Sequence, residues 1–97
     1  MDKKEELIKK LTNKLPEIRR SIGLSQTDFG TLIGLSRQTI SSIERGEGTL
    51  SWGNYLAIIF LLKNYKMDVF NMYYDVFDGI DDLIVEFNNK TGEKTKK

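Results

Sequence analysis

The chain has 97 residues, the size of a single domain, and 39% of them are hydrophobic and 30% charged. This is the composition of an ordinary folded protein. There is no cysteine, which excludes disulfides and thiolate metal sites, and no histidine, the commonest general base and metal ligand. The chain also lacks a phosphate-binding glycine motif, so we expect neither an enzyme nor a bound metal or cofactor.

The net charge of +1 hides an uneven distribution. Residues 1–66 hold 11 basic and 7 acidic side chains, residues 67–89 hold 6 acids and no base, and residues 90–97 hold 4 lysines and 1 glutamate. A mildly basic body joined to an acidic segment predicts two faces with different partners. The alternative is that the acids only form a solvated helix face.

Two features of the sequence indicate where the protein acts. The longest purely apolar or aromatic run, residues 55–62, has 8 residues, far short of the ~20 that span a bilayer. Residues 1–6 lack the apolar stretch of a secretory signal. We therefore expect a cytoplasmic protein with no membrane partner.

Apolar residues recur at helical spacing nearly throughout, which predicts an all-α fold, a compact bundle of five to six helices. A first helix is expected from about residue 2 to residue 13. Pro16 disfavours helical geometry just before it but fits the first turn of a second helix, which stops near Gly23. Alternatively, the two merge into one bent helix. On the first reading, residues 1–14 are a separate amphipathic helix in front of a domain at residues 15–66.

Two short helices are expected next, each opened by a serine. Ser25 is a candidate N-cap for a helix that runs to about residue 33. Gly34 then provides a left-handed stop, and Ser36 can cap a second helix over residues 37–45. The side chains that these helices are expected to bury are Phe29, Leu32, Ile33, Ile40 and Ile43.

Two short helices across a tight turn are typical of a helix-turn-helix, which presents its second helix to the major groove of DNA. Gly30 is small where the second helix must approach closely, and Gly34 permits the turn. The outward face of the second helix is polar and has no acid. Arginine can pair with guanine and glutamine with adenine, and serine is short enough to let the helix lie close to the groove floor. The outward residues are Arg37, Gln38, Ser41 and Ser42.

Ser51 can cap a long helix that runs to about residue 65. Because this helix is apolar on most sides, we expect it at the centre of the core. Trp52 and Tyr55 within it are expected to pack against other side chains and not to stack on bases.

Residues 67–89 carry more apolar side chains than one helix on a small core can bury. Part of the segment is expected to pack on the N-terminal helix, or on another chain in a symmetric homodimer. A different protein is the alternative partner. Residues 90–97 are expected to be a loose tail. The residues expected at the dimer contact are Phe70, Tyr73, Phe77, Ile80, Ile84 and Phe87.

Three stretches of the motif have a distinctive combined spacing: residues 23–26 (GLSQ), 34–41 (GLSRQTIS) and 43–46 (IERG). With them, residues 15–62 resemble the phage-repressor/Cro-type (XRE-like) helix-turn-helix family. The resemblance implies a lambda-repressor-like domain of five helices, dimeric binding and DNA operators with two-fold symmetry.

The resemblance also implies roles for individual residues. Gln26 would contact a phosphate. Arg37, Gln38 and Ser42 would face the bases, with Thr39 and Ser41 nearby. Arg45 would lie toward the DNA backbone, although it could instead pair with Glu44 or Glu47. The loop at residues 47–50 departs from the family in carrying one acid and no base, so Thr49, Ser51 or backbone amides would have to hold a phosphate there. The implied DNA-binding residues are Gln26, Ser36, Arg37, Gln38, Thr39, Ser41, Ser42 and Arg45.

The sequence thus predicts a prokaryotic or phage transcription regulator that binds a palindromic operator in double-stranded DNA as a dimer. Repression is favoured over activation. It is either a phage-type regulator or an antitoxin that regulates its own operon and binds a protein through residues 67–89. A protein–protein adaptor that does not read DNA is the remaining alternative. An adaptor should carry acids or large apolar residues on the outward face of the second short helix, and this chain carries neither.

Overall fold

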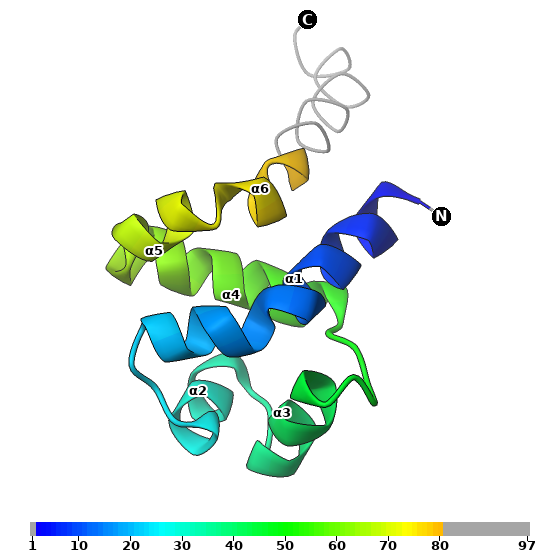
Figure 1. The fold of residues 1–97 in the computed structure, drawn as a ribbon, viewed down its shortest axis with the longest axis vertical. Coiled ribbons are helices and arrows are strands. Elements are labelled where there is room, and N and C mark those ends of the chain that lie inside the picture. The colour runs from blue at the N-terminus through cyan, green and yellow to red at the C-terminus, as the bar shows by residue number, and fades with distance from the viewer. Residues whose placement is uncertain (1, 81–97) are drawn as a thin grey trace, which may run out of the picture.

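The computed structural model describes residues 2–80, which form six helices and no strand. This confirms the all-α prediction for the described residues. Helices α2 and α3 lie side by side at one end of the molecule, α5 and α6 lie at the other, and α1 and α4 run between them (Figure 1). The helices are α1 (Lys3–Ser21), α2 (Gln26–Ile33), α3 (Arg37–Glu44), α4 (Trp52–Tyr65), α5 (Met67–Met72) and α6 (Tyr74–Phe77).

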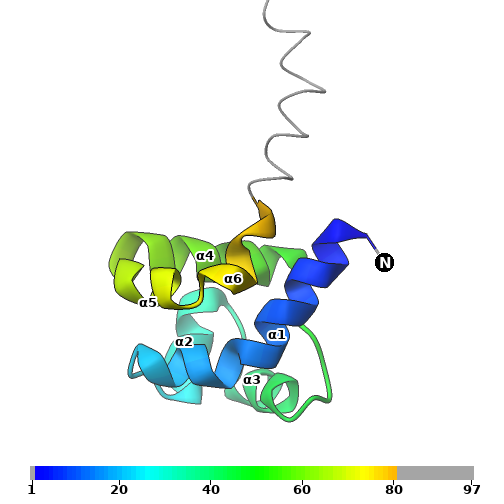
Figure 2. The same cartoon turned by 45° about the horizontal axis from the view of Figure 1, so that its top comes forward.

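Helix α1 is a single helix that continues through Pro16, as the alternative of one merged helix predicted. It begins at Asp2, whose carboxylate accepts a hydrogen bond from the Glu5 amide at 2.8 Å. Pro16 has no N–H to donate to the carbonyl of Thr12, and the helix bends along its length (Figures 1 and 2). The expected division at residue 14 therefore falls inside one helix. Its buried side chains are Leu7, Leu11, Leu15 and Ile18.

Three of the helices begin at the serines that the sequence indicated. In each case the serine hydroxyl accepts a hydrogen bond from the amide three residues later, which satisfies one of the free N–H groups of the first turn. Asn54 also returns a side-chain bond to the amide of the capping serine, which completes a capping box on α4. The pairs are Ser25 with Asp28 at 3.0 Å, Ser36 with Thr39 at 3.1 Å and Ser51 with Asn54 at 3.0 Å.

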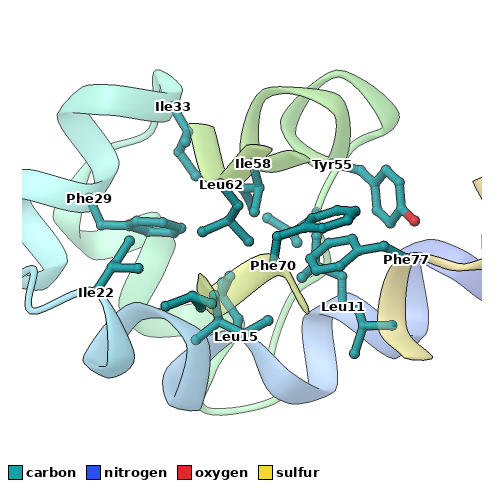
Figure 3. Close-up of a cluster of buried hydrophobic side chains, with 14 of the residues drawn as sticks. Leu11, Leu15, Ile22, Phe29, Ile33, Tyr55, Ile58, Leu62, Phe70 and Phe77 are labelled. Carbon is teal, nitrogen blue, oxygen red and sulfur yellow. The ribbon is translucent and has the colours of Figure 1, made fainter. Parts of the chain in front are cut away.

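One hydrophobic cluster joins all six helices. Figure 3 shows a part of it. Helix α4 contributes Tyr55, Ile58 and Leu62, which are fully buried. The rings of Phe70 and Phe77 stack on each other in the same cluster, with centroids 5.0 Å apart. The core therefore includes side chains from α1 to α6, so the N-terminal helix and residues 67–80 both contribute to it.

One expectation about burial was wrong. Leu32 is 57% exposed, because only the face of α2 that carries Phe29 and Ile33 meets the other helices. Helix α4 lies in the core as predicted, but one side of it remains accessible, since Leu56 and Phe60 are 43% and 63% exposed. An apolar composition on all sides of a helix therefore does not place every side in the core.

Residues 67–80 fold back onto the N-terminal helix. A Cβ atom at Gly79 would lie 2.7 Å from Cδ2 of Leu7. The backbone at Gly79 therefore approaches the Leu7 side chain more closely than a larger residue would allow unless Leu7 moved. Phe70 and Phe77, expected at a dimer contact, are 5% and 0% exposed within the chain's own core. Tyr73 and Ile80 are partly buried against the same cluster, and the expected contacts Ile84 and Phe87 lie outside the described residues.

The described acids of this segment lie away from the helix-turn-helix. Asp68, Asp75 and Asp78 are exposed on or directly after α5 and α6. In both views these helices are on the opposite side of the molecule from α3 (Figures 1 and 2). The negative charge therefore faces away from the outward side of α3. None of the helices within residues 2–80 combines the length and the apolar character needed to cross a membrane.

Candidate nucleic-acid interface

The turn between α2 and α3 is fixed by two glycines. Gly34 has φ +83°, a left-handed conformation that favours glycine, and it ends α2. The amide of Leu35 donates to the carbonyl of Gly30 at 2.8 Å, and a Cβ atom on Gly30 would lie 2.2 Å from the Leu35 carbonyl oxygen. This close approach sets the angle at which α3 leaves the turn, and both glycines have the roles predicted for them.

Helix α3 has one apolar and one polar face. Ile40 and Ile43 are buried in the core at 0% and 4% exposure. On the other side, five of the predicted DNA-binding residues line one open hollow, and the two serines there are half-buried. The structure therefore brings these residues together on a single surface of α3. They are Arg37, Gln38, Ser41, Ser42 and Arg45.

Two more predicted residues lie at the N-terminal end of α3. Ser36 caps the helix, and its hydroxyl also donates to Oγ1 of Thr39 at 3.0 Å. Both side chains are exposed. Their hydroxyls are thus held at the helix N-terminus, where free N–H groups and the helix dipole favour an anion.

Gln26, the remaining predicted residue, is held by an ion pair that links three helices. Its Nε2 donates to Oε1 of Glu44 at 3.0 Å. Arg19 on α1 donates to the same carboxylate, from Nε to Oε2 at 2.7 Å and from Nη2 to Oε1 at 3.1 Å, and from Nη1 to the carbonyl of Leu24 at 2.8 Å. The side chains of Arg19 and Glu44 are only 12% and 8% exposed. The start of α2 and the end of α3 are therefore joined through Glu44.

The surroundings of Glu44 also set its protonation. Burial alone would raise the pKa of its carboxyl, because it disfavours the charged form. The hydrogen bonds from Arg19 and Gln26, together with the positive charges of Arg19 and Arg20, outweigh that effect and hold the pKa below its usual value. Glu44 is therefore ionised near neutral pH and available as an acceptor for Gln26.

Sequence reasoning missed this ion pair. The sequence indicates Glu44 as part of the motif at residues 43–46 and as a possible partner for Arg45, and no pattern in it points to Arg19. The two residues are 25 positions apart, so no local spacing indicates that they meet. Only the packing of α1 against α3 brings them together.

The side chain of Arg45 lies against α3 and does not extend away from it. It caps the C-terminus of α3, and its guanidinium donates to the hydroxyls of Ser41 and Ser42 and to Oε1 of Glu47, the last at 3.0 Å. The side chains of Arg45 and Glu47 are 55% and 62% exposed. Of the two acids proposed as alternative partners, Glu47 is the one that pairs with Arg45.

The loop before α4 uses its hydroxyls within the chain. Oγ1 of Thr49 lies 3.4 Å from Oγ1 of Thr12 on α1. The hydroxyl and the amide of Ser51 both contact Oδ1 of Asn54, at 2.8 Å and 3.2 Å. A phosphate anchored here would have to displace or share these contacts.

The chemistry of this surface is that of hydrogen-bond recognition. Guanidinium groups stand at both ends of the hollow on α3, with an amide and two hydroxyls between them. Such groups bind base edges in the major groove and phosphate oxygens. Across residues 2–80 no group of three or more acidic, histidine or cysteine side chains is placed to share a metal ion.

Comparison with known proteins singles out the same part of the chain. Residues 17–54 match a protein family described as Helix-turn-helix. An uncharacterized HTH-type transcriptional regulator of Bacillus subtilis (strain 168), YgzD, is 40% identical over 37 residues, which are 38% of this chain and 56% of that protein. The chain therefore spans about half the length of this curated relative. No solved structure has significant similarity to the chain. The family match begins in α1 and ends in the first turn of α4, so it contains all of α2 and α3.

Proposed function

We propose that the chain is a DNA-binding transcription regulator whose helix α3 enters the major groove of double-stranded DNA, because residues 17–54 match a helix-turn-helix family. One observation carries the proposal. The face of α3 opposite Ile40 and Ile43 gathers five polar side chains and no acid around one hollow. A surface helix that served only solubility would more often carry glutamate and lysine. The regulator would act in the cytoplasm of a prokaryote or on behalf of a phage.

Within this proposal the residues divide into base and phosphate contacts. Arg37 suits the O6 and N7 acceptors of guanine, Gln38 suits adenine, and Ser42 suits either. Gln26 keeps a second amide hydrogen after bonding Glu44, and that hydrogen can reach a phosphate. Arg45 suits a phosphate at the other end of the helix. Ser36, Thr39 and Ser41 support these contacts from the same surface.

We further propose that the protein represses transcription as a homodimer on a palindromic operator. One short helix contacts only a few base pairs, which gives little selectivity in a genome. Two copies related by a two-fold axis would place their α3 helices ~34 Å apart in successive major grooves. A dimer held in this way across an operator would block access to a promoter. The acids of α5 and α6 support this orientation, because they lie on the side away from α3.

An adaptor that binds only proteins through the same domain fits the surface less well. The outward side of α3 has neither an acid nor a large apolar side chain to anchor a partner. Its guanidinium and amide groups instead match the donor and acceptor pattern of base edges. The DNA-binding proposal is therefore favoured by the chemistry of this one helix.

The proposal is tested by selecting bound duplexes from a randomised pool and sequencing them. We expect a two-fold symmetric site to be enriched, and Arg37→Ala to relax one base position by ~1–3 kcal/mol. Lys10→Ala is the matched control, because it removes one positive charge beside Asp75 and Asp78, on the side away from α3. If no site is enriched and residual binding is weak and fully lost in salt, α3 does not read DNA.

A further inference from the structure

The guanidinium of Arg45 makes three hydrogen bonds within its own chain. Nη1 donates to the hydroxyl of Ser41, and Nη2 donates to the hydroxyl of Ser42 at 3.4 Å and to Oε1 of Glu47 at 3.0 Å. Arg45 therefore lies over both serines, which are half-buried although they face outward. In this arrangement the guanidinium of Arg45, which could bind a phosphate, is paired with the carboxylate of Glu47.

The backbone places Glu47 in this position. Gly46 has φ +82°, its amide donates to the carbonyl of Ile43 at 3.0 Å, and the amide of Glu47 donates to the carbonyl of Ser42 at 2.9 Å. These two bonds form the Schellman motif that ends many helices. Because the turn is fixed by backbone bonds, Glu47 is held beside the last turn of α3 instead of sampling a flexible loop.

The other acid of α3 and of the loop that follows it does not play this part. Residues 37–51 contain only two acids, Glu44 and Glu47. Glu44 is turned inward and is paired with Arg19. The carboxylate of Glu47 is thus the acid of this stretch that stands where the outward side of α3 would meet DNA.

Carboxylate and phosphate oxygens bind the same donors of a guanidinium. A phosphate that reaches Arg45 must displace Glu47 or share the guanidinium with it, and in either case it approaches a second negative charge. If Arg45 moves to a phosphate, the hydroxyls of Ser41 and Ser42 are released from it and become available to base edges. Breaking the pair is therefore coupled to exposing two residues of the reading surface.

We propose that Glu47 is a selectivity-determining residue that competes with DNA phosphate for Arg45. This inference rests on the proposed DNA-binding function. On nonspecific DNA no base contact offsets the free energy lost when the Arg45–Glu47 pair breaks, so Arg45 stays with Glu47 and contributes no phosphate contact. On the operator, base contacts by Ser41 and Ser42 offset this loss, and Arg45 moves to a phosphate of the DNA backbone. Glu47 thus weakens binding to nonspecific DNA more than binding to the operator.

The test is the variant Glu47→Gln, with operator and nonspecific duplexes measured over a range of salt concentrations. Glu47 is exposed, so the fold should be unaffected. We expect nonspecific affinity to rise about fivefold at low salt. The slope of log affinity against log salt for nonspecific DNA should steepen by about 0.9, the value of one additional phosphate contact. The slope for the operator should not change, since Arg45 already contacts a phosphate there.

Two controls isolate the pair. Glu17→Gln removes the same charge from another exposed ion pair, with Lys14 at 3.6 Å, and should leave the nonspecific slope unchanged. In an Arg45→Ala background, Glu47→Gln should have no effect beyond that of Glu17→Gln. If the wild type selects an operator but Glu47→Gln changes neither nonspecific affinity nor slope, the role of Glu47 is overturned and the proposed function stands. If neither the wild type nor any variant binds DNA, both are overturned.

Discussion

Arg19 on α1 donates two hydrogen bonds to the carboxylate of Glu44 at the end of α3, from Nε at 2.7 Å and from Nη2 at 3.1 Å. Both side chains are nearly enclosed, and Gln26 at the start of α2 donates to the same carboxylate. The pair therefore connects the N-terminal helix to both helices of the helix-turn-helix. Loss of one partner would leave a charge with little water to compensate it.

Glu44→Gln should lower the free energy of unfolding by about 3 kcal/mol, because it leaves the guanidinium of Arg19 without its counter-charge. Urea unfolding followed by circular dichroism measures the change. The double variant Arg19→Met with Glu44→Leu should recover most of the loss, since apolar side chains fill the same space without a buried charge. Glu17→Gln, in the exposed pair with Lys14, should change stability by less than ~1 kcal/mol. Equal effects of Glu17→Gln and Glu44→Gln would contradict this account.

The same pair predicts how stability depends on pH. The pKa of Glu44 is lower in the folded chain than its usual value of 4.5, so the folded state favours the ionised form. Its stabilisation is therefore fully present above pH 4.5 and is lost as the pH falls through the lowered pKa. Urea unfolding between pH 7 and pH 3 should show that the difference in unfolding free energy between the wild type and Glu44→Gln shrinks as the pH falls below 4.5. A stability difference that stays constant across the whole range would show that the carboxylate charge is not its source.

The contact at Gly30 predicts a large effect from one methyl group. Gly30→Ala would place a Cβ atom 2.2 Å from the carbonyl oxygen of Leu35, which is backbone and cannot rotate away. Separating α2 from α3 to relieve this clash should lower stability by about 3 kcal/mol, and it should also weaken DNA binding because α3 changes its angle. Thermal unfolding and duplex binding measure the two effects.

Gly48→Ala is the matched control for this substitution. A Cβ atom there would lie 3.6 Å from Cγ1 of Ile43, an ordinary contact, and the residue has no positive φ. We expect Gly48→Ala to be neutral or to stabilise the fold by about 0.5 kcal/mol, because alanine restricts the unfolded chain. If both alanine variants behaved alike, the close approach at Gly30 would not be what sets the position of α3.

The parts of the fold that the sequence predicted depend on contacts within a few residues. The caps at Ser25, Ser36 and Ser51 and the stop at Gly34 each act within one turn, so their spacing alone indicated the helix-turn-helix. The polar outward face of α3 follows from the same periodicity, since the positions of Ile40 and Ile43 decide which residues face outward.

The features of the fold that the sequence left open depend on which helix faces pack against each other. Pro16 marks a helix start by local preference, yet the burial of Leu11, Leu15 and Ile18 on one face keeps α1 continuous through it. Helical periodicity showed that Phe70 and Phe77 lie on an apolar face, but not whether that face meets the same chain or another. In the structure it meets α1 and α4 of the same chain, as Figure 3 shows for the two rings.

This burial leads to a prediction about the segment that follows α4. Phe77 is fully buried within the chain, so Phe77→Ala should lower the free energy of unfolding by about 4 kcal/mol through the cavity it leaves. Met72→Ala, at a position that is 66% exposed, should change it by less than ~0.5 kcal/mol. Thermal unfolding at several protein concentrations separates a core role from a role between chains.

If Phe77 acts within the core, the loss on Phe77→Ala is the same at every protein concentration. If it instead holds two copies together, the wild-type unfolding midpoint rises with concentration, and Phe77→Ala produces a folded monomer whose midpoint does not depend on concentration. Analytical ultracentrifugation of both variants completes the test. A homodimer that survives Phe77→Ala but is lost on Met72→Ala would place the contact on the exposed side of α5, which is compatible with the burial of both phenylalanines.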